Sequence, residues 1–590
     1  MTKLSDYLVR KLESAGVRCV FMVTGGGAMH LNDSFGKSKK IKCVFNHHEQ
    51  ASAMAAEGYA RVHQQLAVVC VTSGPGGLNC LNGVFGAWTD SAPVLFISGQ
   101  VKTSTTRATC PKLALRQLGD QEVDIVRMVT PVTKYARMLT NPADIDVVLE
   151  EAIYHATHGR PGPVWLDIPL NVQAAPIDTQ RIKKFMPPIC RKLPLEQKLH
   201  RAISWLKHAC KPLVVIGHGV RLSATQQAVL QLLKQTSVPA VTTFNGFDLL
   251  PADSPHFAGR IGTVGQRAGN FTLQNADVVL FLGTRNNIRQ ISYNWENFAK
   301  HAKKIVIDID PAELNKPTVK PDLPICTDLK NALPILLKEL RQPLGTSAWR
   351  QHCKQLCRDY PPLREFSISL SDAVHPYLFM QTLSRLLPAR SIVTASNGTA
   401  CVAFYQAFEN KPNQRLILNS GDASMGYGLP ASLGACMASR KTVICLEGDG
   451  SIMMNLQELQ TVKTNHLPLK IFILKNGEYC SIVQTQRNFF NGHLTGCNAQ
   501  SGVEVPDFVK IAKAFGLPAV RITKNRDLEK GIKKVLQTPG PIICELDCTS
   551  NYLLSPKLSA RKLPDGTMVS PSLEDMFPFL DRQDYEQALF

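Results

Sequence analysis

The sequence predicts an α/β fold made of three doubly wound domains, each built on a parallel β-sheet. Short apolar runs, typical of buried parallel strands, alternate along the chain with segments of helical spacing. The length of 590 residues gives room for three domains of this kind. Polar or weakly patterned stretches separate three alternating segments. We therefore expect domains at residues 1–175, 195–340 and 374–550, followed by a C-terminal tail at 551–590.

The first segment begins with the alternation on which this prediction depends. An apolar run at 19–23 reads as a buried strand and ends in three glycines. A run at 42–45 reads as a second strand and leads into an alanine-rich helix predicted over 49–64. Further strands are predicted at 67–71 and 94–97. Because helices separate the strands, we expect the strands to pair in parallel.

The second and third segments repeat this alternation. The stretch from 175 to 194 is polar and contains prolines, so it is predicted to be a linker. Central strands are predicted at 212–217, 277–283 and 304–310. The region from 342 to 373 shows less pattern, and the third segment follows it. That segment shares the α/β pattern of the first, which indicates related folds.

The composition limits the classes of protein to which this chain can belong. The formal net charge is +19, but Lys and Arg are spread along the chain, which favours a solvated basic surface over nucleic-acid binding. No apolar run reaches the ~18 residues of a membrane span. The N-terminus lacks the apolar core of a signal peptide, so a cytoplasmic protein is expected. The 17 cysteines are scattered without a CxxC pair, which predicts reduced core thiols and no zinc site.

The most informative motif is Gly448-Asp449-Gly450, which is followed by Asn476 at the end of the next predicted strand. The strand–loop–helix–strand pattern places Asp449 and Asn476 at adjacent carboxyl ends of parallel strands, where open α/β sheets bind ligands. Their oxygens suit Mg²⁺, and the glycines let backbone amides approach a diphosphate. A GDG triplet alone is usually an ordinary turn. The spacing and Asn476 favour a metal–diphosphate site.

With Asn476, this motif resembles the fingerprint of thiamine diphosphate enzymes. Longer runs are similar to the acetohydroxyacid (acetolactate) synthase large-subunit family, and they follow its order over essentially the whole chain. These runs are His48–Arg61, Thr72–Asn79, Asp90–Pro93, Ile97–Gln100, Gln121–Asp124, Arg160–Val164 and Met425–Pro430. The resemblance implies that the three domains are a pyrimidine-binding domain, a central nucleotide-binding-like domain and a diphosphate-binding domain.

The resemblance also implies roles for individual residues. A glutamate at a helix start, such as Glu49, is ordinarily a capping residue. Here it would exchange a proton with the aminopyrimidine of the cofactor, a task suited to a buried carboxyl group. Gln121 would orient the donor substrate, and Mg²⁺ would be held by Asp449, Asn476 and Glu478. The cofactor would also contact Gly25, Asn79, Gly448, Gly450, Ser451 and Met425, the last as a wedge that bends it.

The central segment resembles the FAD-binding domain of the same family. Arg160, Gly265, Arg285 and Asp308 would contact FAD, which is usually non-redox in this branch. Where relatives carry Phe-Asp-Asp-Arg, this chain has Asn286-Asn-Ile-Arg289. An empty or altered nucleotide site is therefore the alternative to bound FAD.

Two departures from the family fall in the predicted substrate pocket. Relatives that make acetolactate usually have Phe-Gln-Glu and Gln-Trp-Gln, whereas here Asp120 replaces the phenylalanine and Thr485 replaces the tryptophan. These changes open the acceptor side and make it more polar, which could redirect the acceptor. The loop at 476–482 and the tail resemble synthase-like proteins of surface-sugar gene clusters. Some of those transfer a two-carbon unit to a keto-sugar nucleotide.

The sequence therefore predicts a thiamine diphosphate- and Mg²⁺-dependent carboligase, a transferase. It would decarboxylate pyruvate and pass the two-carbon unit to a carbonyl acceptor, either a 2-keto acid or a keto-sugar nucleotide. A 2-hydroxyacyl lyase and a 2-keto acid decarboxylase are alternatives within the same chemistry. A non-catalytic nucleotide-binding regulator is the alternative from another class. It predicts loss of Glu49, Asp449 or Asn476, and all three are present.

The resemblance also implies an assembly. In this family the glutamate and the GDG site lie in different subunits, so a homodimer is the minimum functional unit and a homotetramer is an alternative. No nucleic-acid or membrane partner is expected. The sequence names neither the acceptor nor a regulatory subunit.

Overall fold

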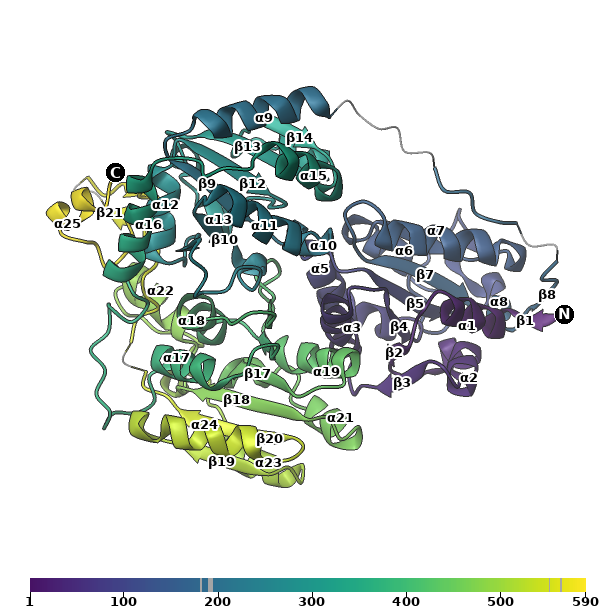
Figure 1. Cartoon of the computed structure of the whole chain (residues 1–590). Coiled ribbons are helices and arrows are strands. Elements are labelled where there is room, and N and C mark those ends of the chain that lie inside the picture. The colour runs from purple at the N-terminus through teal and green to yellow at the C-terminus, as the bar shows by residue number, and fades with distance from the viewer. Residues whose placement is uncertain (181–182, 189–194, 551, 563–564) are drawn as a thin grey trace.

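The computed structural model describes all residues except 181–182, 189–194, 551 and 563–564. The predicted linker at 175–194 and the predicted tail at 551–590 lie partly outside the described residues. Three six-stranded sheets follow one another along the chain, and their strands pair in parallel. Helices lie against the sheets (Figure 1). The predicted α/β fold class of three parallel-sheet domains is confirmed.

The N-terminal and C-terminal sheets have the same strand order. Counted along each domain, the spatial order is second, first, third, fourth, sixth and fifth. In the N-terminal sheet the strands in spatial order are β3 (Lys42–Phe45), β2 (Cys19–Met22), β4 (Ala67–Val71), β5 (Val94–Gln100), β7 (Val164–Pro169) and β6 (Tyr135–Met138). In the C-terminal sheet they are β16 (Arg415–Leu418), β15 (Ile392–Ala395), β17 (Val443–Gly448), β18 (Leu469–Lys475), β20 (Ile542–Asp547) and β19 (Ala519–Ile522). The shared order supports the related folds indicated by the sequence pattern.

The central sheet is ordered differently. Its strands lie third, second, first, fourth, fifth and sixth, which is the order of dinucleotide-binding Rossmann domains. They are β11 (Phe257–Arg260), β10 (Ala240–Thr242), β9 (Pro212–Ile216), β12 (Val278–Leu282), β13 (Lys303–Asp308) and β14 (Leu323–Cys326). The order reverses between β9 and β12, so the ligand crevice of this domain is expected above the ends of these two strands.

The region at 342–373 holds a helix that the sequence reading did not identify. This helix, α16 (Ser347–Asp359), buries Trp349, Cys353 and Leu356 on one face. The Trp349 indole also donates a hydrogen bond to the Pro212 carbonyl at the start of β9 (2.9 Å). The spacing of these three residues is helical, but the polar residues between them hid the pattern.

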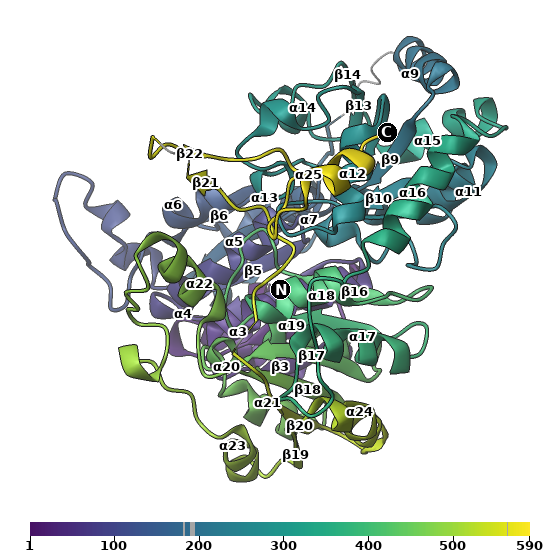
Figure 2. The ribbon, with the colours of Figure 1, turned by 90° about the vertical axis from the view of Figure 1, so that its left-hand side faces the viewer.

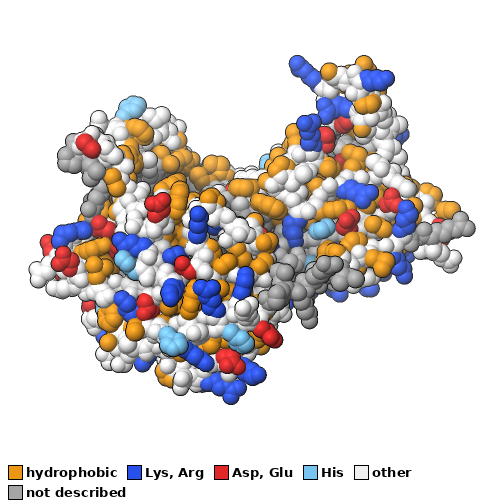
Figure 3. All heavy atoms as spheres, turned by 90° about the horizontal axis from the view of Figure 1, so that it is seen from above, with side chains coloured by type: hydrophobic (Ala, Val, Ile, Leu, Met, Phe, Trp, Pro, Cys, Tyr) orange, Lys and Arg blue, Asp and Glu red, His pale blue; other side chains and the backbone are white. Residues whose placement is uncertain are grey.

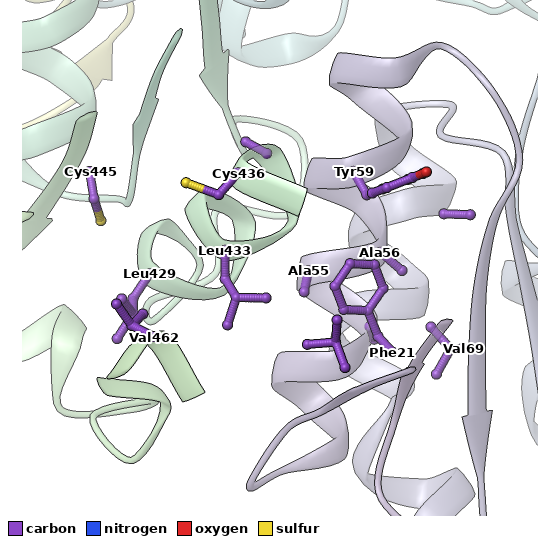
Figure 4. Packing of buried hydrophobic residues seen from close by; sticks show 14 of the residues in the cluster. Phe21, Ala55, Ala56, Tyr59, Val69, Leu429, Leu433, Cys436, Cys445 and Val462 are labelled. Atoms are coloured by element: carbon purple, nitrogen blue, oxygen red, sulfur yellow. The ribbon is translucent and has the colours of Figure 1, made fainter. Parts of the chain in front are cut away.

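The N-terminal and C-terminal domains meet along α3 (Glu49–His63) and α19 (Gly428–Ser439) (Figures 1 and 4). A Cβ atom at Gly434 would overlap the Ala55 carbonyl group, and one at Gly58 would overlap the Ala431 backbone. The two helices therefore cross with their backbones in contact, which explains why both are rich in small residues. Larger apolar side chains, among them Leu433, pack around this crossing (Figure 4).

A buried guanidinium joins all three domains. Nη1 of Arg61, on α3, donates to Asp90 (3.0 Å) and to the Leu418 carbonyl of the C-terminal domain (2.8 Å). Its Nη2 donates to Asn245 of the central domain (3.2 Å). The Asn245 amide in turn donates to the second oxygen of Asp90 (2.8 Å). A single side chain thus makes hydrogen bonds to each of the three domains.

A second buried ion group extends this junction. Arg415 of the C-terminal domain donates to the Arg61 carbonyl (3.2 Å) and to Asp248 of the central domain (2.8 Å). Arg221 lies on the other oxygen of Asp248 (3.0 Å). Burial alone would raise the pKa of Asp248, but Arg221 and Arg415 outweigh it and hold the pKa at about 2.

On the face drawn in Figure 3, Lys and Arg side chains are scattered among other residues and do not form a continuous basic patch. The C-terminal tail, with β21 (Arg561–Lys562), β22 (Met568–Val569) and α25 (Arg582–Gln587), runs along the central domain (Figure 2). Arg267 and Asn270 of that domain hold it by hydrogen bonds to the Met576 and Leu573 carbonyls. In the part of the chain that the structure describes, no helix is both long and apolar enough to cross a bilayer.

We expect the variant Gly434→Ala to lower the free energy of unfolding by about 1–3 kcal/mol, because the added methyl group forces α3 and α19 apart. Thermal unfolding followed by circular dichroism would measure this. Gly36→Ala is a matched control: Gly36 is also helical, in α2 (Met29–Lys37), but nothing lies within 4 Å of its Cβ position. Equal melting temperatures for the two variants would contradict the close backbone contact.

Candidate functional site

The GDG motif lies at the carboxyl ends of two neighbouring strands. Asp449 follows β17 and is buried, and Asn476 follows β18, which pairs with β17. Oδ2 of Asp449 accepts hydrogen bonds from the backbone N–H groups of Asn476 (2.9 Å) and Gly477 (2.8 Å), and Oδ1 accepts one from Gly450 (2.8 Å). Burial raises the pKa of Asp449, and these donors oppose the rise. One carboxylate thus ties the two loops together.

Open space borders the backbone at this edge of the sheet. Gly398 and Gly477 follow β15 and β18, and Gly448 is the last residue of β17; among non-neighbouring residues, no atom lies closer than 3.8 Å to a Cβ position at any of them. The strand order reverses between β15 and β17, the position at which such sheets bind ligands. Backbone groups bordering open space at three adjacent strand ends form a cradle that suits a diphosphate.

The donor set here suits a hard cation that shares its ligands with a phosphate. Asp449 supplies a carboxylate and Asn476 an amide oxygen, which also accepts from the Glu478 N–H (3.1 Å). Among the described residues, no three His, Cys, Asp or Glu side chains form a group that could hold a metal. A cation at this site would therefore take further oxygens from the ligand, as Mg²⁺ does with phosphates. The residues fit Mg²⁺ and a diphosphate.

The turn that carries Met425 is fixed to the GDG loop. Ser451 accepts a hydrogen bond from the Gly426 N–H (2.9 Å) and also bonds the Ser396 hydroxyl. Met425 itself is partly exposed. On the other side of the loop, Gly450 packs under the Tyr479 ring so closely that a Cβ would overlap it.

Sequence reasoning missed Glu447, which precedes the GDG motif. It is fully buried, and its carboxylate accepts the Leu429 N–H at the start of α19 (2.7 Å). Burial raises its pKa to about 7. The signal was a glutamate at the end of an otherwise apolar run. Glu447 links the GDG loop to the helix that crosses α3.

Glu49 begins α3, as the sequence predicts. The structure brings it together with Asn79, whose amide donates to Oε2 of Glu49 (2.9 Å). Gly25 lies in the loop that follows β2, and a Cβ atom on it would overlap the Thr72 side chain. Thr72 also accepts the Gly27 N–H (3.1 Å). These residues follow three neighbouring strands: Glu49 follows β3, Gly25 follows β2, and Thr72 and Asn79 follow β4.

Gln121 lies in the segment between β5 and α6 (Ile125–Val129), which projects from the edge of the molecule (Figure 2). Its φ of 61° is left-handed, and its carbonyl packs against Gly74, where a side chain would not fit. Asp120 beside it is exposed.

Glu122, which sequence reasoning did not single out, organises this segment. Its buried carboxylate accepts the N–H groups of Arg107 (2.6 Å), Leu118 (3.0 Å) and Gly119 (3.2 Å). Both ends of the projecting loop are therefore held by one side chain, immediately after Gln121.

The two groups of predicted residues share no hydrogen bond or ion pair among the described residues. Glu49 bonds Asn79, whereas Asp449 bonds the loop after β18. Thr485 lies on α22 (Cys480–Phe489), where its hydroxyl donates to the Ser481 carbonyl (2.9 Å), and it makes no such bond to Asp120 either.

A separate cleft, with about 960 Å³ of empty volume, lies at the carboxyl ends of the central strands. The predicted residues Arg160, Arg285 and Asp308 line it, together with His218 and Gly219 after β9. Arg160 bonds Asp310 (2.9 Å) and Glu313 (2.8 Å). Gly265 lies outside this lining, in a turn packed on the Arg260 and Gly262 backbone. The cleft occupies the crevice where the Rossmann order reverses, which suits a dinucleotide.

The chain matches three family models along its length. They are described as the thiamine pyrophosphate enzyme N-terminal TPP binding domain (residues 2–128), central domain (199–336) and C-terminal TPP binding domain (396–546). The fold and the strand-end site thus define the class of protein as a thiamine pyrophosphate enzyme.

Curated relatives narrow the class. The chain is 33% identical over 543 residues to the acetolactate synthase isozyme 2 large subunit of Escherichia coli (strain K12), covering 91% of this chain and 94% of that one. It is 32% identical over 560 residues to acetolactate synthase 1, chloroplastic, of Zea mays, covering 92% and 85%. The Arabidopsis thaliana acetolactate synthase, chloroplastic, is 31% identical over 564 residues, covering 92% and 81%. The chain belongs to the acetolactate synthase large-subunit family.

We expect Glu122→Ala to loosen the projecting loop, because three backbone N–H groups lose their acceptor. Trypsin cleavage after Lys112 and Arg116 should accelerate by about tenfold, equivalent to about 1.4 kcal/mol of local stability. Gel or mass-spectrometric time courses would measure it. Asp120→Ala removes an exposed carboxylate two residues away and should leave the rate unchanged. Similar rates for both variants would remove Glu122 from this role.

Proposed function

We propose that this chain is a thiamine diphosphate- and Mg²⁺-dependent carboligase, which decarboxylates pyruvate and transfers the two-carbon unit to a carbonyl acceptor. The observation that carries the proposal is the Asp449 carboxylate, which joins the loops after β17 and β18 beside glycine-bordered open space. Membership of the acetolactate synthase family supports the carboligase reaction over other uses of such a site.

When bound, thiamine diphosphate would supply the carbon centre that stabilises the charge left by decarboxylation. In this proposal Glu49 holds a proton for the pyrimidine ring of the cofactor. The Asn79 amide fixes Oε2 of Glu49, which leaves Oε1 for proton exchange. The side chains of Asp449 and Asn476, with the backbone carbonyl of Glu478, would hold Mg²⁺ against the diphosphate.

The acceptor side is proposed to recognise an anion. The segment 102–119 contains Lys102, Arg107, Lys112 and Arg116 and no acidic residue. It leads directly into Asp120 and Gln121, whose backbone is fixed against Gly74. A positive loop beside the reacting groups suits a 2-keto acid or a keto-sugar nucleotide, both of which carry negative charge. In this proposal Gln121 orients the donor, while Asp120 and Thr485 shape the acceptor pocket.

We further propose a homodimer whose chains complete each other's site. Exposed apolar side chains flank both halves: Phe45 precedes Glu49, Phe85 and Trp88 follow Asn79 on α5 (Leu81–Thr89), and Met453 and Met454 follow the GDG loop. Exposed apolar surface beside an incomplete site is typical of an interface. The lack of any hydrogen bond or ion pair between the Glu49 and Asp449 groups, among the described residues, supports the same arrangement.

The central cleft is proposed to bind FAD in a non-redox role. The strand order is that of Rossmann domains. The loops after β9 and β12 lie so close together that a Cβ atom on Gly219 would be 2.7 Å from the Cα atom of Gly283. Both features support a nucleotide crevice. Arg160 and Arg285 supply positive charge for its diphosphate.

Glu49→Gln should lower kcat by about 10²–10⁴-fold while cofactor affinity stays near wild type, because only the proton is lost. Asp449→Ala should instead weaken thiamine diphosphate binding by at least ~10-fold at fixed Mg²⁺. Steady-state kinetics and calorimetric titration separate the two effects. Undiminished turnover by Glu49→Gln would exclude the role of Glu49, and wild-type affinity in Asp449→Ala would remove Asp449 from the metal site.

The reaction itself is tested by incubating the protein with pyruvate, thiamine diphosphate and Mg²⁺ and following the products by NMR. We expect pyruvate consumption. Rapid acetolactate formation would identify a 2-keto acid as the acceptor. Slow pyruvate consumption with release of acetaldehyde or acetoin, which a keto-sugar nucleotide turns into faster pyruvate consumption and a sugar product, would identify the sugar instead. Complete absence of pyruvate turnover would overturn the proposed donor and favour a lyase.

A further inference from the structure

We propose that a groove between the N-terminal and C-terminal domains binds a phosphate-rich anion, such as the triphosphate of a nucleotide. The groove, here called the seam groove, consists of two adjoining cavities that share His63 and Ala438. Their empty volumes are about 1080 and 870 Å³. The groove lies where the C-terminal ends of α3 and α19 meet. Its basic residues are Arg18, Lys42, His63, Arg390, Arg415, Arg440 and Lys441, of which Arg415 is paired with Asp248.

Apart from Arg415, which pairs with Asp248, the Lys and Arg side chains of the seam groove have no carboxylate partner among the described residues. No Asp or Glu lines either cavity. Among the described residues, no carboxylate lies in salt-bridge range of Lys42, Arg390, Arg440 or Lys441. Arg18 donates only to the backbone carbonyls of Glu13 and Val17. Like charges gathered in one groove repel one another, and a bound anion relieves that repulsion.

Tyr59 lies in the groove together with arginines of both domains. Tyr59 lines the groove near the end of α3, and Cys436 of α19 lies beside it at the same end of the crossing (Figure 4). Burial raises the pKa of the Tyr59 hydroxyl to about 12, while Arg18 and Arg440 both act to lower it. Arg18 of the N-terminal domain and Arg440 of the C-terminal domain line the same cavity as Tyr59.

Helix ends alone do not account for this charge. Basic residues commonly lie at helix C-termini, because each terminus carries roughly half a negative charge. The ends of α3 and α19 thus amount to about one negative charge. Besides Arg415, which Asp248 pairs, six basic side chains line the groove. Without His63, the five charges of Arg18, Lys42, Arg390, Arg440 and Lys441 still exceed what the two helices neutralise.

The groove also has an apolar side that suits the base of a nucleotide. Met437, Leu467 and Pro468 line it, and the Tyr59 ring lies against the His63 ring with centroids 5.3 Å apart. This site is distinct from the proposed catalytic site. Glu49 and His63 are the first and last residues of α3, so they are about 20 Å apart along the helix axis.

The test is calorimetric titration of the full-length protein with ATP and with inorganic tripolyphosphate, in low salt with EDTA. The variant Lys42→Gln/Arg440→Gln/Lys441→Gln removes three charges from the groove. The control Lys510→Gln/Lys513→Gln/Lys530→Gln removes three exposed charges from elsewhere in the C-terminal domain. We expect the groove variant to lose about tenfold or more in affinity and the control less than about twofold.

Two further variants separate this site from the others. Asp449→Ala and Arg285→Gln alter the proposed metal site and the central cleft, and both should keep wild-type ATP affinity. Their failure to bind would assign the signal to those sites and overturn the proposal. Tighter binding of ATP than of tripolyphosphate supports a nucleotide, whereas equal binding supports recognition of the phosphate chain itself. Equal losses in the groove and control variants, or no binding by either probe, would overturn the seam groove.

A second readout does not depend on activity. Because a ligand that binds only the folded protein stabilises it, ATP should raise the melting temperature of the wild type and of the control variant. The groove variant should show no such rise. A rise of equal size in all three proteins would contradict binding at the groove.

Discussion

The arrangement of the three domains depends on one buried cation. Arg61 bonds Asp90 of its own domain, the Leu418 carbonyl of the C-terminal domain and Asn245 of the central domain. A charge enclosed in this way must keep its partners, since removing one member of a buried pair typically costs about 3–5 kcal/mol. The junction also borders the central cleft, which Asp90 and Asn245 line. The position of that cleft is therefore set by the contacts that hold the domains together.

The sequence predicted the features that depend on local order. Asp449 and Asn476 could be placed together because a strand–helix–strand unit brings their strand ends side by side, and Glu49 could be placed because a helix start follows an apolar strand. It could not place Arg61, because its partners near residues 245 and 418 are distant in the chain. Nor could it show the part of Glu122, whose partners are backbone N–H groups that any sequence possesses. The cleft lining, which includes His218 and omits Gly265, depends on how three domains meet.

The N-terminal and C-terminal sheets share one strand order, and the central sheet has another. The N-terminal and C-terminal sheets each present loops at their carboxyl ends, one with Glu49 and Asn79, the other with Asp449 and Asn476. The central sheet, with the dinucleotide order, presents its own crevice and contributes no residue to either group. The proposed reaction site and the proposed nucleotide crevice thus lie on separate sheets, which are connected by the junction at Arg61 and by the bonds of Arg160 to Asp310 and Glu313.

The crossing of α3 and α19 has a consequence for motion. Where backbones touch without intervening side chains, as at Gly434 and Ala55, neither helix can slide or rotate without a clash, because there are no rotamers to absorb the change. The two domains that carry Glu49 and Asp449 therefore act as a rigid frame. Any closure during a catalytic cycle must be carried by the segments at the rim, such as 102–119 and 489–502, whose side chains are largely exposed.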